Sequence, residues 1–399
     1  MHSNGYKVEV GRSVSEVLAL RADWQRLPLD PNADMDFYLA VVQSKAEVRR
    51  PHVFVLKQNG VVKSILVGRI EKRSLDVRLG YTNLASPPIR LLTLVHGGVL
   101  GEDSEEHASA LVESVKKSLR DDEADVAWFH GLDSDSAFCH VARNAGGLFT
   151  RDYLPTQVQR WRIKLPATYQ ELYRQRSANT KHNLKRYSRR LRDTFGDRLT
   201  IRNFRDPSDL RTLIADTEAI ARKTYHRGLG VGFVADDAML QLATLAANQG
   251  WLRAHILYVE GKPCAFWNGF LYRRTFFAWT TGFDPDFSEL RPGMFLLQRT
   301  LEDLCAERAA DEVDFGFGDA QYKRDWCDHE RLQESFFLFA PRLKGISLNC
   351  FRTPLAAASK IARQVLARAG VLQELKKSWR ARLKRQDTRA GNNKWNPKI

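Results

Sequence analysis

Two periods of apolar residues run through the first half of the chain and predict its elements. Alternation with period two predicts a series of strands: 6–10, 52–58, 61–71, 75–83, "DVAWFHG" and "TQVQRWRIKL". The helical period predicts two helices, near 14–27 and over "SEEHASALVESVKKSLR". The turn "QNG" between the second and third strands is typical of a hairpin.

The second half repeats this order. It begins with the strand "LTIRNF" and helices near 208–226 and 235–249. Three antiparallel strands follow in 251–283, then the helix "GMFLLQRTLEDLCAERAA" and the strands "EVDFGFG" and "QESFFLFA". The repetition suggests a duplicated fold. We therefore predict an α/β (α+β) protein with two tandem units, each a mixed, mostly antiparallel sheet flanked by helices. The predicted domains are 1–165 and 166–340, followed by a basic segment, 341–399.

Composition narrows the class of protein. Apolar residues make up 43% and aromatic residues 10% of the 399 positions, as in folded globular proteins. The five cysteines are scattered, and the ten histidines show no metal-ligand spacing, so we expect neither a disulfide framework nor a metal site. The first residues lack the apolar core of a signal peptide, and no apolar run approaches the roughly 20 residues that span a bilayer. These features predict a cytoplasmic protein.

The positive charge is concentrated at the C-terminus. Of a net charge of +15, residues 341–399 contribute 15 Lys and Arg minus 2 acids, or +13, which leaves +2 for the rest. Apolar residues recur there at roughly helical spacing: Ile361, Val365, Leu366, Val371, Leu372, Leu375, Trp379 and Leu383. Such a helix suits an anionic membrane surface, so we expect peripheral contact at the inner face of the membrane. RNA is the competing partner, but no nucleic-acid motif supports it.

A second basic stretch lies in "NTKHNLKRYSRRLR", where one apolar stripe of a predicted helix is surrounded by cations. A charge run of this kind is most often a solvated helix face.

The segment 280–304 predicts an anion site. A strand ends near Thr281 and Gly282, and a loop leads to "RPGMF", where a helix begins. Free N–H groups at a helix start bind anions, Gly293 permits close approach, and Arg291 adds positive charge. The plain alternative is that "RPG" only starts a helix. At the equivalent point of the first half, "GEDSEE" places acids that would repel a phosphate.

The strand "VDFGFG" has two different faces by its period of two. Val313, Phe315 and Phe317 share one face, and Asp314, Gly316 and Gly318 share the other. The second face leaves room for a ligand beside one carboxylate.

Residues from about 170 to 330 resemble the GNAT acyltransferase superfamily, in particular its CelD-like or BioF-like acetyltransferase branch. The matching stretches are the basic helix, "GWLRAHILYVEGKPCAFWNGF", "TGFDPDFSELRPGMFLLQRTLEDL" and "DFGFGDAQYKRDW". The resemblance implies tandem GNAT-like units with a degenerate first unit, similar in architecture to Fem-type peptidyltransferases. The loop "ELRPGMFL" departs from the usual GNAT pattern in having a single glycine.

The resemblance also implies the ligands and the site. Acetyl-CoA or another acyl-CoA would be the co-substrate, with its pyrophosphate on the loop before the 293–308 helix. The candidate cofactor-binding residues are Thr281, Gly282, Arg291, Pro292, Gly293, Met294 and Phe295. The candidate acceptor-binding residues are Tyr225, His226, Arg227 and Trp279, of which His226 could also be a base.

Acyl transfer to an amine needs a base for the amine and a proton donor for the departing thiolate. We assign Asp319 or Asp314 as base, Tyr322 as general acid and Lys323 to an anionic group of the acceptor; packing and turn roles are the alternative. The acceptor would be a small-molecule or lipid- or sugar-linked amine, such as an amino sugar or another cell-envelope or polysaccharide precursor. The rival hypotheses are a Fem-like aminoacyl-tRNA-dependent peptidyltransferase and a non-catalytic envelope-associated scaffold.

Overall fold

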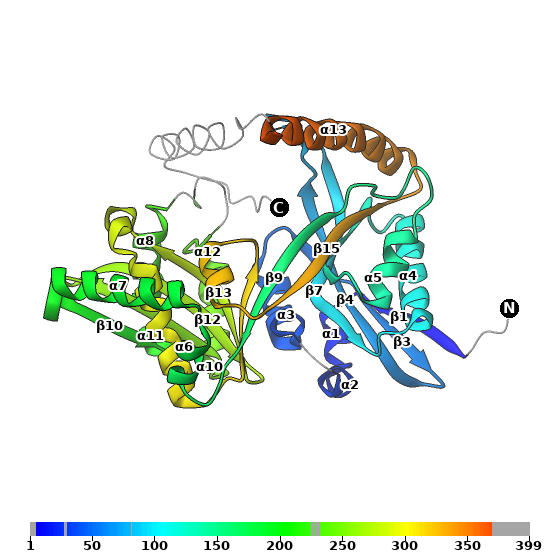
Figure 1. Cartoon of the computed structure of the whole chain (residues 1–399). Helices are drawn as coiled ribbons and strands as arrows, with labels where there is room; N and C mark the ends of the chain where they lie inside the picture. The colour runs from blue at the N-terminus through cyan, green and yellow to red at the C-terminus, as the bar shows by residue number, and fades with distance from the viewer. Residues whose placement is uncertain (1–4, 28–29, 81, 225–226, 228–231, 369–399) are drawn as a thin grey trace. The chain divides into compact units, whose positions relative to one another are not determined.

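The computed structural model describes residues 5–27, 30–80, 82–224, 227 and 232–368 (Figure 1). Its contacts divide the chain into two compact units. The described parts of Met1–Val158 and Leu332–Leu372 form the first unit, and those of Gln159–Arg331 form the second. We describe each unit by itself.

The first unit is a mixed sheet with helices on both faces. Its strands are β1 (Tyr6–Gly11), β2 (Val48–Pro51), β3 (Val53–Gln58), β4 (Val61–Ser74), β5 (Val77–Leu79), β6 (Thr82–Ala85), β7 (Pro88–Gly101), β8 (Val126–Asp133) and β15 (His329–Phe339). Its helices are α1 (Val14–Leu18), α2 (Arg21–Arg26), η1 (Pro31–Ala33), α3 (Met35–Ser44), α4 (Glu105–Arg120), α5 (Ala137–Asn144) and α13 (Leu343–Arg368).

The second unit is also a mixed sheet flanked by helices. Its strands are β9 (Thr156–Lys164), β10 (Leu199–Phe204), β11 (Leu252–Val259), β12 (Lys262–Tyr272), β13 (Thr275–Phe283) and β14 (Glu312–Phe317). Its helices are α6 (Tyr169–Gln175), α7 (Ala178–Phe195), η2 (Gly196–Arg198), η3 (Pro207–Asp209), α8 (Leu210–Ala221), α10 (Asp237–Asn248), η4 (Pro285–Leu290), α11 (Pro292–Glu307) and α12 (Gln321–Trp326).

The two units have the same pattern of strand pairing. In the first, the order is β1-β3-β4-β7-β8-β15, and in the second it is β10-β11-β12-β13-β14-β9. In each, three antiparallel pairings are followed by one parallel and one antiparallel pairing. The structure thus confirms the mixed, mostly antiparallel sheet flanked by helices, and the repeated order seen in the sequence reappears as a repeated topology.

Two strands differ from the predicted domain boundaries. The strand at 156–164 closes the predicted 1–165 domain, but it pairs with β14 of the second unit. The strand predicted to end the 166–340 domain pairs instead with β8 of the first unit. Chain order suggested the boundaries, whereas the backbone hydrogen bonds of each strand decide its unit.

Alternation along β3 shows how the first core forms on both faces of the sheet. Phe54 and Leu56 point into a cluster with α4 and α5, whereas Val53 and Val55 pack with α1, α2 and α3. In the second unit, α6, α7 and α11 cover a core that includes Trp267 on β12.

Several elements of the structure differ from those predicted. The predicted helix at 14–27 is two short helices, α1 and α2, and the predicted strand at 75–83 is the separate β5–β6 hairpin. The sequence did not predict α3 or the long strand β7. The "QNG" hairpin is confirmed, because Asn59 and Gly60 have φ of 52° and 82°, as the tight turn requires. None of the helices in the described ranges is both long and apolar enough to cross a membrane.

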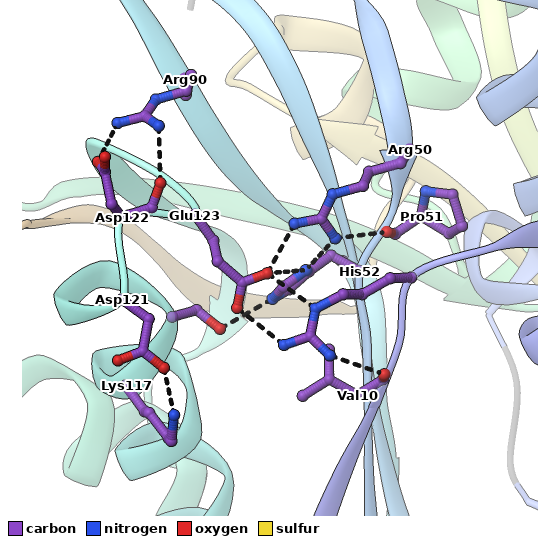
Figure 2. A network of polar contacts seen from close by, with 12 residues as sticks. Val10, Arg50, Pro51, His52, Arg90, Lys117, Asp121, Asp122 and Glu123 are labelled. Atoms are coloured by element: carbon purple, nitrogen blue, oxygen red, sulfur yellow. Dashed lines mark hydrogen bonds and ion pairs between the residues drawn. The ribbon is translucent and has the colours of Figure 1, made fainter.

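A partly buried ionic network joins the end of α4 to the sheet of the first unit (Figure 2). The Glu123 carboxylate accepts hydrogen bonds from Arg12, with Nε at 2.9 Å, and from Arg50 at 2.7 Å. The ring of His52 lies beside it and contacts the Ser118 hydroxyl at 2.9 Å. The hydrogen bond from Arg12 is the main cause that lowers the pKa of Glu123 to about 2, and burial lowers the pKa of His52 to about 3.

We predict that Glu123→Gln lowers the free energy of unfolding by about 2 kcal/mol at neutral pH, because two guanidinium groups lose their counter-ion. The wild-type pKa lies below that of the unfolded chain, so the contribution is complete above about pH 4.5 and is lost as the pH falls toward 2. Urea unfolding of both proteins across this range measures the difference. A difference that does not shrink at acid pH would contradict the ionic origin.

Candidate active site in the second unit

The two parallel strands of the second unit separate part-way along their length. β13 and β14 pair only from Thr275–Glu312 to Phe277–Asp314. β13 continues to Phe283 and β14 to Phe317 without pairing with each other. We call the space between these unpaired ends the strand split.

The end of β14 bends away because of Gly316. This residue has φ of 68°, in the left-handed region that glycine adopts without strain, and the register with β9 shifts between Asp314 and Phe317. No described atom lies within 4 Å of the position of a Cβ at Gly316 or Gly318, so the predicted room is present. The predicted parity is wrong beyond Phe315, because the bend breaks the alternation and leaves Phe317 37% exposed.

Asp314 anchors the end of the paired segment. Its side chain is 1% exposed and forms ion pairs with Arg160 Nε at 2.7 Å and Arg162 Nε at 2.8 Å. It also accepts the N–H of Gly316 at 2.8 Å. Both oxygens of this carboxylate are thus engaged, one by two guanidinium groups and the other by a backbone N–H. These contacts give Asp314 a structural role, and its assignment as a base stays a prediction.

Asp319 lies in a more open position. Its side chain is half-exposed and pairs with Arg324, whose Nε donates at 2.7 Å. The pair is of the solvent-exposed kind that contributes little to stability.

Three aromatic rings line the core side of the split. Trp267 of β12, Phe315 of β14 and Tyr322 of α12 meet edge to face, with ring centroids 5.5 to 5.9 Å apart. Burial raises the pKa of the Tyr322 phenol, which therefore stays protonated at neutral pH. Within the described residues its hydroxyl has no hydrogen-bond partner. Tyr322 is thus a protonated group with an available hydroxyl.

Trp267 connects this cluster to the predicted anion site. Its indole N–H donates to the carbonyl of Gly293 at 3.1 Å, in the first turn of α11. Sequence reasoning assigned no role to this residue, although a Trp-Asn pair inside an apolar strand is unusual and could have drawn attention to it.

The start of α11 offers fewer free N–H groups to an anion than its sequence suggested. Arg291 has φ of 53°, and its carbonyl accepts the N–H groups of Met294 and Phe295. Pro292 has no N–H, so Gly293 supplies the one first-turn N–H that donates to no carbonyl among the described residues. The Arg291 side chain is exposed beside it, without a described ion-pair partner. Pro292 and Phe295 are buried, and Met294 packs against the core.

The other predicted cofactor residues contact their own strands. The Thr281 hydroxyl donates to the Phe266 carbonyl at 3.1 Å. A Cβ at Gly282 would lie 2.7 Å from the Phe266 ring, so this glycine is required for packing. Their binding roles stay predictions.

A bulge on β13 leaves polar atoms unpaired. Asn268 pairs with Thr280 and Gly269 with Ala278, so Trp279 is the extra residue. The side-chain oxygens of Asn268 and Thr280 are buried and have no hydrogen-bond partner within the described part of the chain. Buried oxygens without partners are costly, so these two atoms suit the polar groups of a ligand that enters the split.

The predicted acceptor residues are only partly described. Tyr225 and His226 lie outside the described residues. Arg227 binds Glu218 at 2.5 Å and the Phe233 carbonyl at 2.8 Å, which commits it to the local loop. The half-buried Trp279 ring packs on Phe270, with centroids 4.6 Å apart.

Lys323 is buried beside the last residues of β14. Its side chain is 5% exposed, and its ammonium donates to the carbonyl oxygens of Phe317 at 2.6 Å and Gly316 at 3.3 Å. Burial lowers its pKa to about 8. These bonds hold α12, and with it Tyr322, against the bent end of β14. These bonds give Lys323 a positioning role, and its contact with an acceptor anion stays a prediction.

Comparison with known proteins identifies the family of this unit. Residues 178–324 match the model of the Acetyltransferase (GNAT) domain, Acetyltransf_6. This chain contains a GNAT acetyltransferase domain. The match covers the basic helix α7, the strand split and α12. No curated protein matches the chain significantly.

Solved structures agree in fold with the GNAT assignment. The "Crystal structure of FemX" aligns with a TM-score of 0.52 and 12% identity, over 81% of this chain and 96% of that one. The C-terminal domain (DUF2156) of a putative lysylphosphatidylglycerol synthetase from Agrobacterium fabrum aligns with a TM-score of 0.50 and 13% identity, over 86% and 96%. At such identities the likeness concerns the fold alone. Together with the family match, it confirms the GNAT resemblance predicted for residues 170–330.

The GNAT domain implies an acyl-CoA co-substrate, and three features of the unit fit one. The free Gly293 N–H and Arg291 suit a pyrophosphate, the unpaired oxygens of Asn268 and Thr280 suit amide groups, and the split leaves space at Gly316. In the described ranges no three His, Cys, Asp or Glu side chains gather as metal ligands would.

We predict that the stability difference between the wild type and Lys323→Met depends on pH. The buried ammonium loses its proton near pH 8, whereas the unfolded chain keeps it to about pH 10.5. The wild type should therefore gain roughly 1–3 kcal/mol relative to the variant between pH 8 and pH 10.5, with no change below pH 8. Denaturant unfolding at pH 7 and pH 10 measures the gain, and an equal difference at both values would contradict the burial of a charged amine.

Proposed function

We propose that this protein is an acyl-CoA-dependent N-acyltransferase, an acetyltransferase in the first instance, whose donor site is the strand split of the second unit. The observation that carries the proposal is the Trp267 link. One indole contacts both Tyr322, in the aromatic cluster of the split, and Gly293, at the helix start proposed to bind the pyrophosphate. This side chain would thus fix the position of the proposed proton donor relative to the helix start.

The first unit supports this assignment by contrast. Its parallel strands β7 and β8 also pair over only four residues, from Leu91–Val126 to Leu94–Phe129. The space beyond them holds the buried side chains of His96 and Gln333, which contact each other at 3.2 Å. Its helix start at α4 carries Glu105 and Glu106 instead of a cation. We infer that the first unit is a degenerate GNAT-like unit that takes no acyl-CoA.

The reaction would need little from the protein beyond positioning and two proton transfers. A bound acyl-CoA supplies a thioester carbonyl. The acceptor amine attacks this carbon, the C–N bond forms, the C–S bond breaks, and the thiolate takes the phenol proton of Tyr322. The amine gives up its proton to Asp319, through water, because that carboxylate is half-exposed whereas Asp314 is fully paired.

The acceptor would be a primary amine on a small or envelope-linked molecule, such as an amino sugar or polysaccharide precursor. Among the described residues near the split, the half-exposed Asp319 carboxylate and the Tyr322 ring suit a neutral or positively charged amine.

A Fem-like transfer from aminoacyl-tRNA is the second candidate. The FemX-like fold and one surface of α7 favour it. On that helix the exposed cations have no described ion-pair partner: Lys185, Arg186, Arg189, Arg190 and Arg192. Binding of charged tRNA without binding of acetyl-CoA would decide for this candidate.

We expect Gly293→Asp to abolish acetyl-CoA binding in calorimetry, by at least about 100-fold, because a carboxylate at the helix start repels the pyrophosphate. Gly293→Ala is the matched control. Its Cβ would meet only Phe283, at an ordinary 3.5 Å, so this variant should fold and keep most of the affinity. Equal affinity for both variants, or no binding of any acyl-CoA to the wild type, would overturn the donor assignment.

We expect Tyr322→Phe to lower kcat by roughly 100-fold or more, since the thiolate loses its proton donor, while acetyl-CoA binding is unchanged. The assay is thiol release from acetyl-CoA in the presence of primary amines, with glucosamine tested first. Tyr173→Phe, which removes a phenol that binds the Lys181 carbonyl away from the split, is the control. Full activity of Tyr322→Phe would remove this residue from the chemistry.

A further inference from the structure

Helix α13 of the first unit has uncharged, partly apolar residues on its exposed side. Its inner side combines the buried Leu348 with polar residues such as Asn349 and Ser359, whereas seven residues on its exposed side carry no charge. We call these seven the outer face of α13: Leu343, Ser347, Cys350, Phe351, Pro354, Ala358 and Ile361. Three of them are large and strongly exposed, with Leu343 at 89%, Phe351 at 70% and Ile361 at 61%.

Hydrogen bonds on the inner side fix this orientation. The buried Asn349 amide donates to the carbonyls of Phe149 at 3.0 Å and Arg151 at 2.9 Å. Arg352 pairs with the buried Asp152 at 3.2 Å. Near the far end, the buried Ser359 hydroxyl accepts the N–H of Gly80 at 2.8 Å. Rotation of the helix would break all of these contacts, so the exposure of the apolar side is built into the fold.

The outer face is a continuous stripe. Its members lie 4, 3, 1, 3, 4 and 3 positions apart in the sequence, which places them within an arc of about 100° on an α-helix. Lys344 lies about 20° beyond one edge of this arc and Lys360 about 80° beyond the other, and both are exposed. An apolar stripe between lysines has the pattern of a helix that lies in a lipid interface.

The charge of the surrounding sequence indicates which partner binds the outer face of α13. The sequence from 341 to 399 carries 15 cationic and 2 anionic side chains, a net charge of 15 − 2 = +13. A second copy of this chain would bring an equal positive charge to the same place, which repulsion opposes. An anionic lipid surface supplies both the opposite charge and an apolar layer for the stripe.

We propose that the outer face of α13 docks this protein on an anionic phospholipid bilayer, with Leu343, Phe351 and Ile361 inserted below the headgroups. The basic sequence around and beyond the helix adds attraction to the anionic headgroups. This docking does not depend on acyl transfer, because it needs only α13 and its charge.

Cosedimentation of the full-length protein with vesicles tests the proposal. Vesicles of phosphatidylcholine with added phosphatidylglycerol should bind, and pure phosphatidylcholine vesicles should bind at least about tenfold less. Added salt should weaken the binding, because it screens the lipid charge. The variant Leu343→Ser/Phe351→Ser/Ile361→Ser should bind the anionic vesicles at least about tenfold less than the wild type.

The controls separate docking from folding and activity. The triple variant changes only exposed side chains, so its thermal unfolding and its acetyl-CoA binding should match the wild type. Val61→Ser removes another strongly exposed apolar residue, on β4, and should leave vesicle binding unchanged. Equal vesicle binding by the triple variant and the wild type would overturn the proposal. So would a dimer, seen by analytical ultracentrifugation and lost in the triple variant, in a wild type that binds no vesicles.

Discussion

The buried carboxylate of Asp314 fixes the point at which β14 leaves β13, and the candidate site depends on this point. Arg160 and Arg162 of β9 hold the carboxylate from the neighbouring strand, and Gly316 donates its N–H to it from two residues along. The ladder therefore stays closed up to Asp314 and turns away immediately after it. Without this anchor, the left-handed bend at Gly316 would have no fixed start, and the split would have no defined width.

The bend in β14 in turn sets the position of α12 and Tyr322. Lys323 binds the two carbonyls that the bend exposes, which sets α12 at the end of β14 and directs Tyr322 toward Trp267. A lysine is costly in such a position, because burial opposes its charge. The buried lysine thus gives up stability and holds the helix of the candidate site in one place.

The two units show how one ladder can serve two purposes. In both units the two parallel strands pair over only a few residues and then separate. The strand order and the pairing directions are also the same in each. In the second unit small residues keep the opening accessible, whereas in the first unit histidine and glutamine side chains fill it. Burial lowers the pKa of His130 to about 3, so the filling near that residue is neutral and suits a packed interior. Helix α13 then adds a surface property, an apolar face directed outward, that neither sheet requires.

The sequence by itself determined the class of fold, the repeated order of elements, the "QNG" turn and the GNAT resemblance, because each depends on local period or on contiguous motifs. It also marked Tyr322 and Gly293 as candidates. Only the tertiary structure decided which unit β9 and β15 join, since backbone ladders form between residues far apart in the chain. The tertiary structure also decided that Asp314 is paired, that Lys323 is buried, and that Trp267 contacts both Tyr322 and Gly293. The sequence around a carboxylate does not show whether arginines will pair with it. Here Arg162 lies 152 residues from Asp314 in the chain.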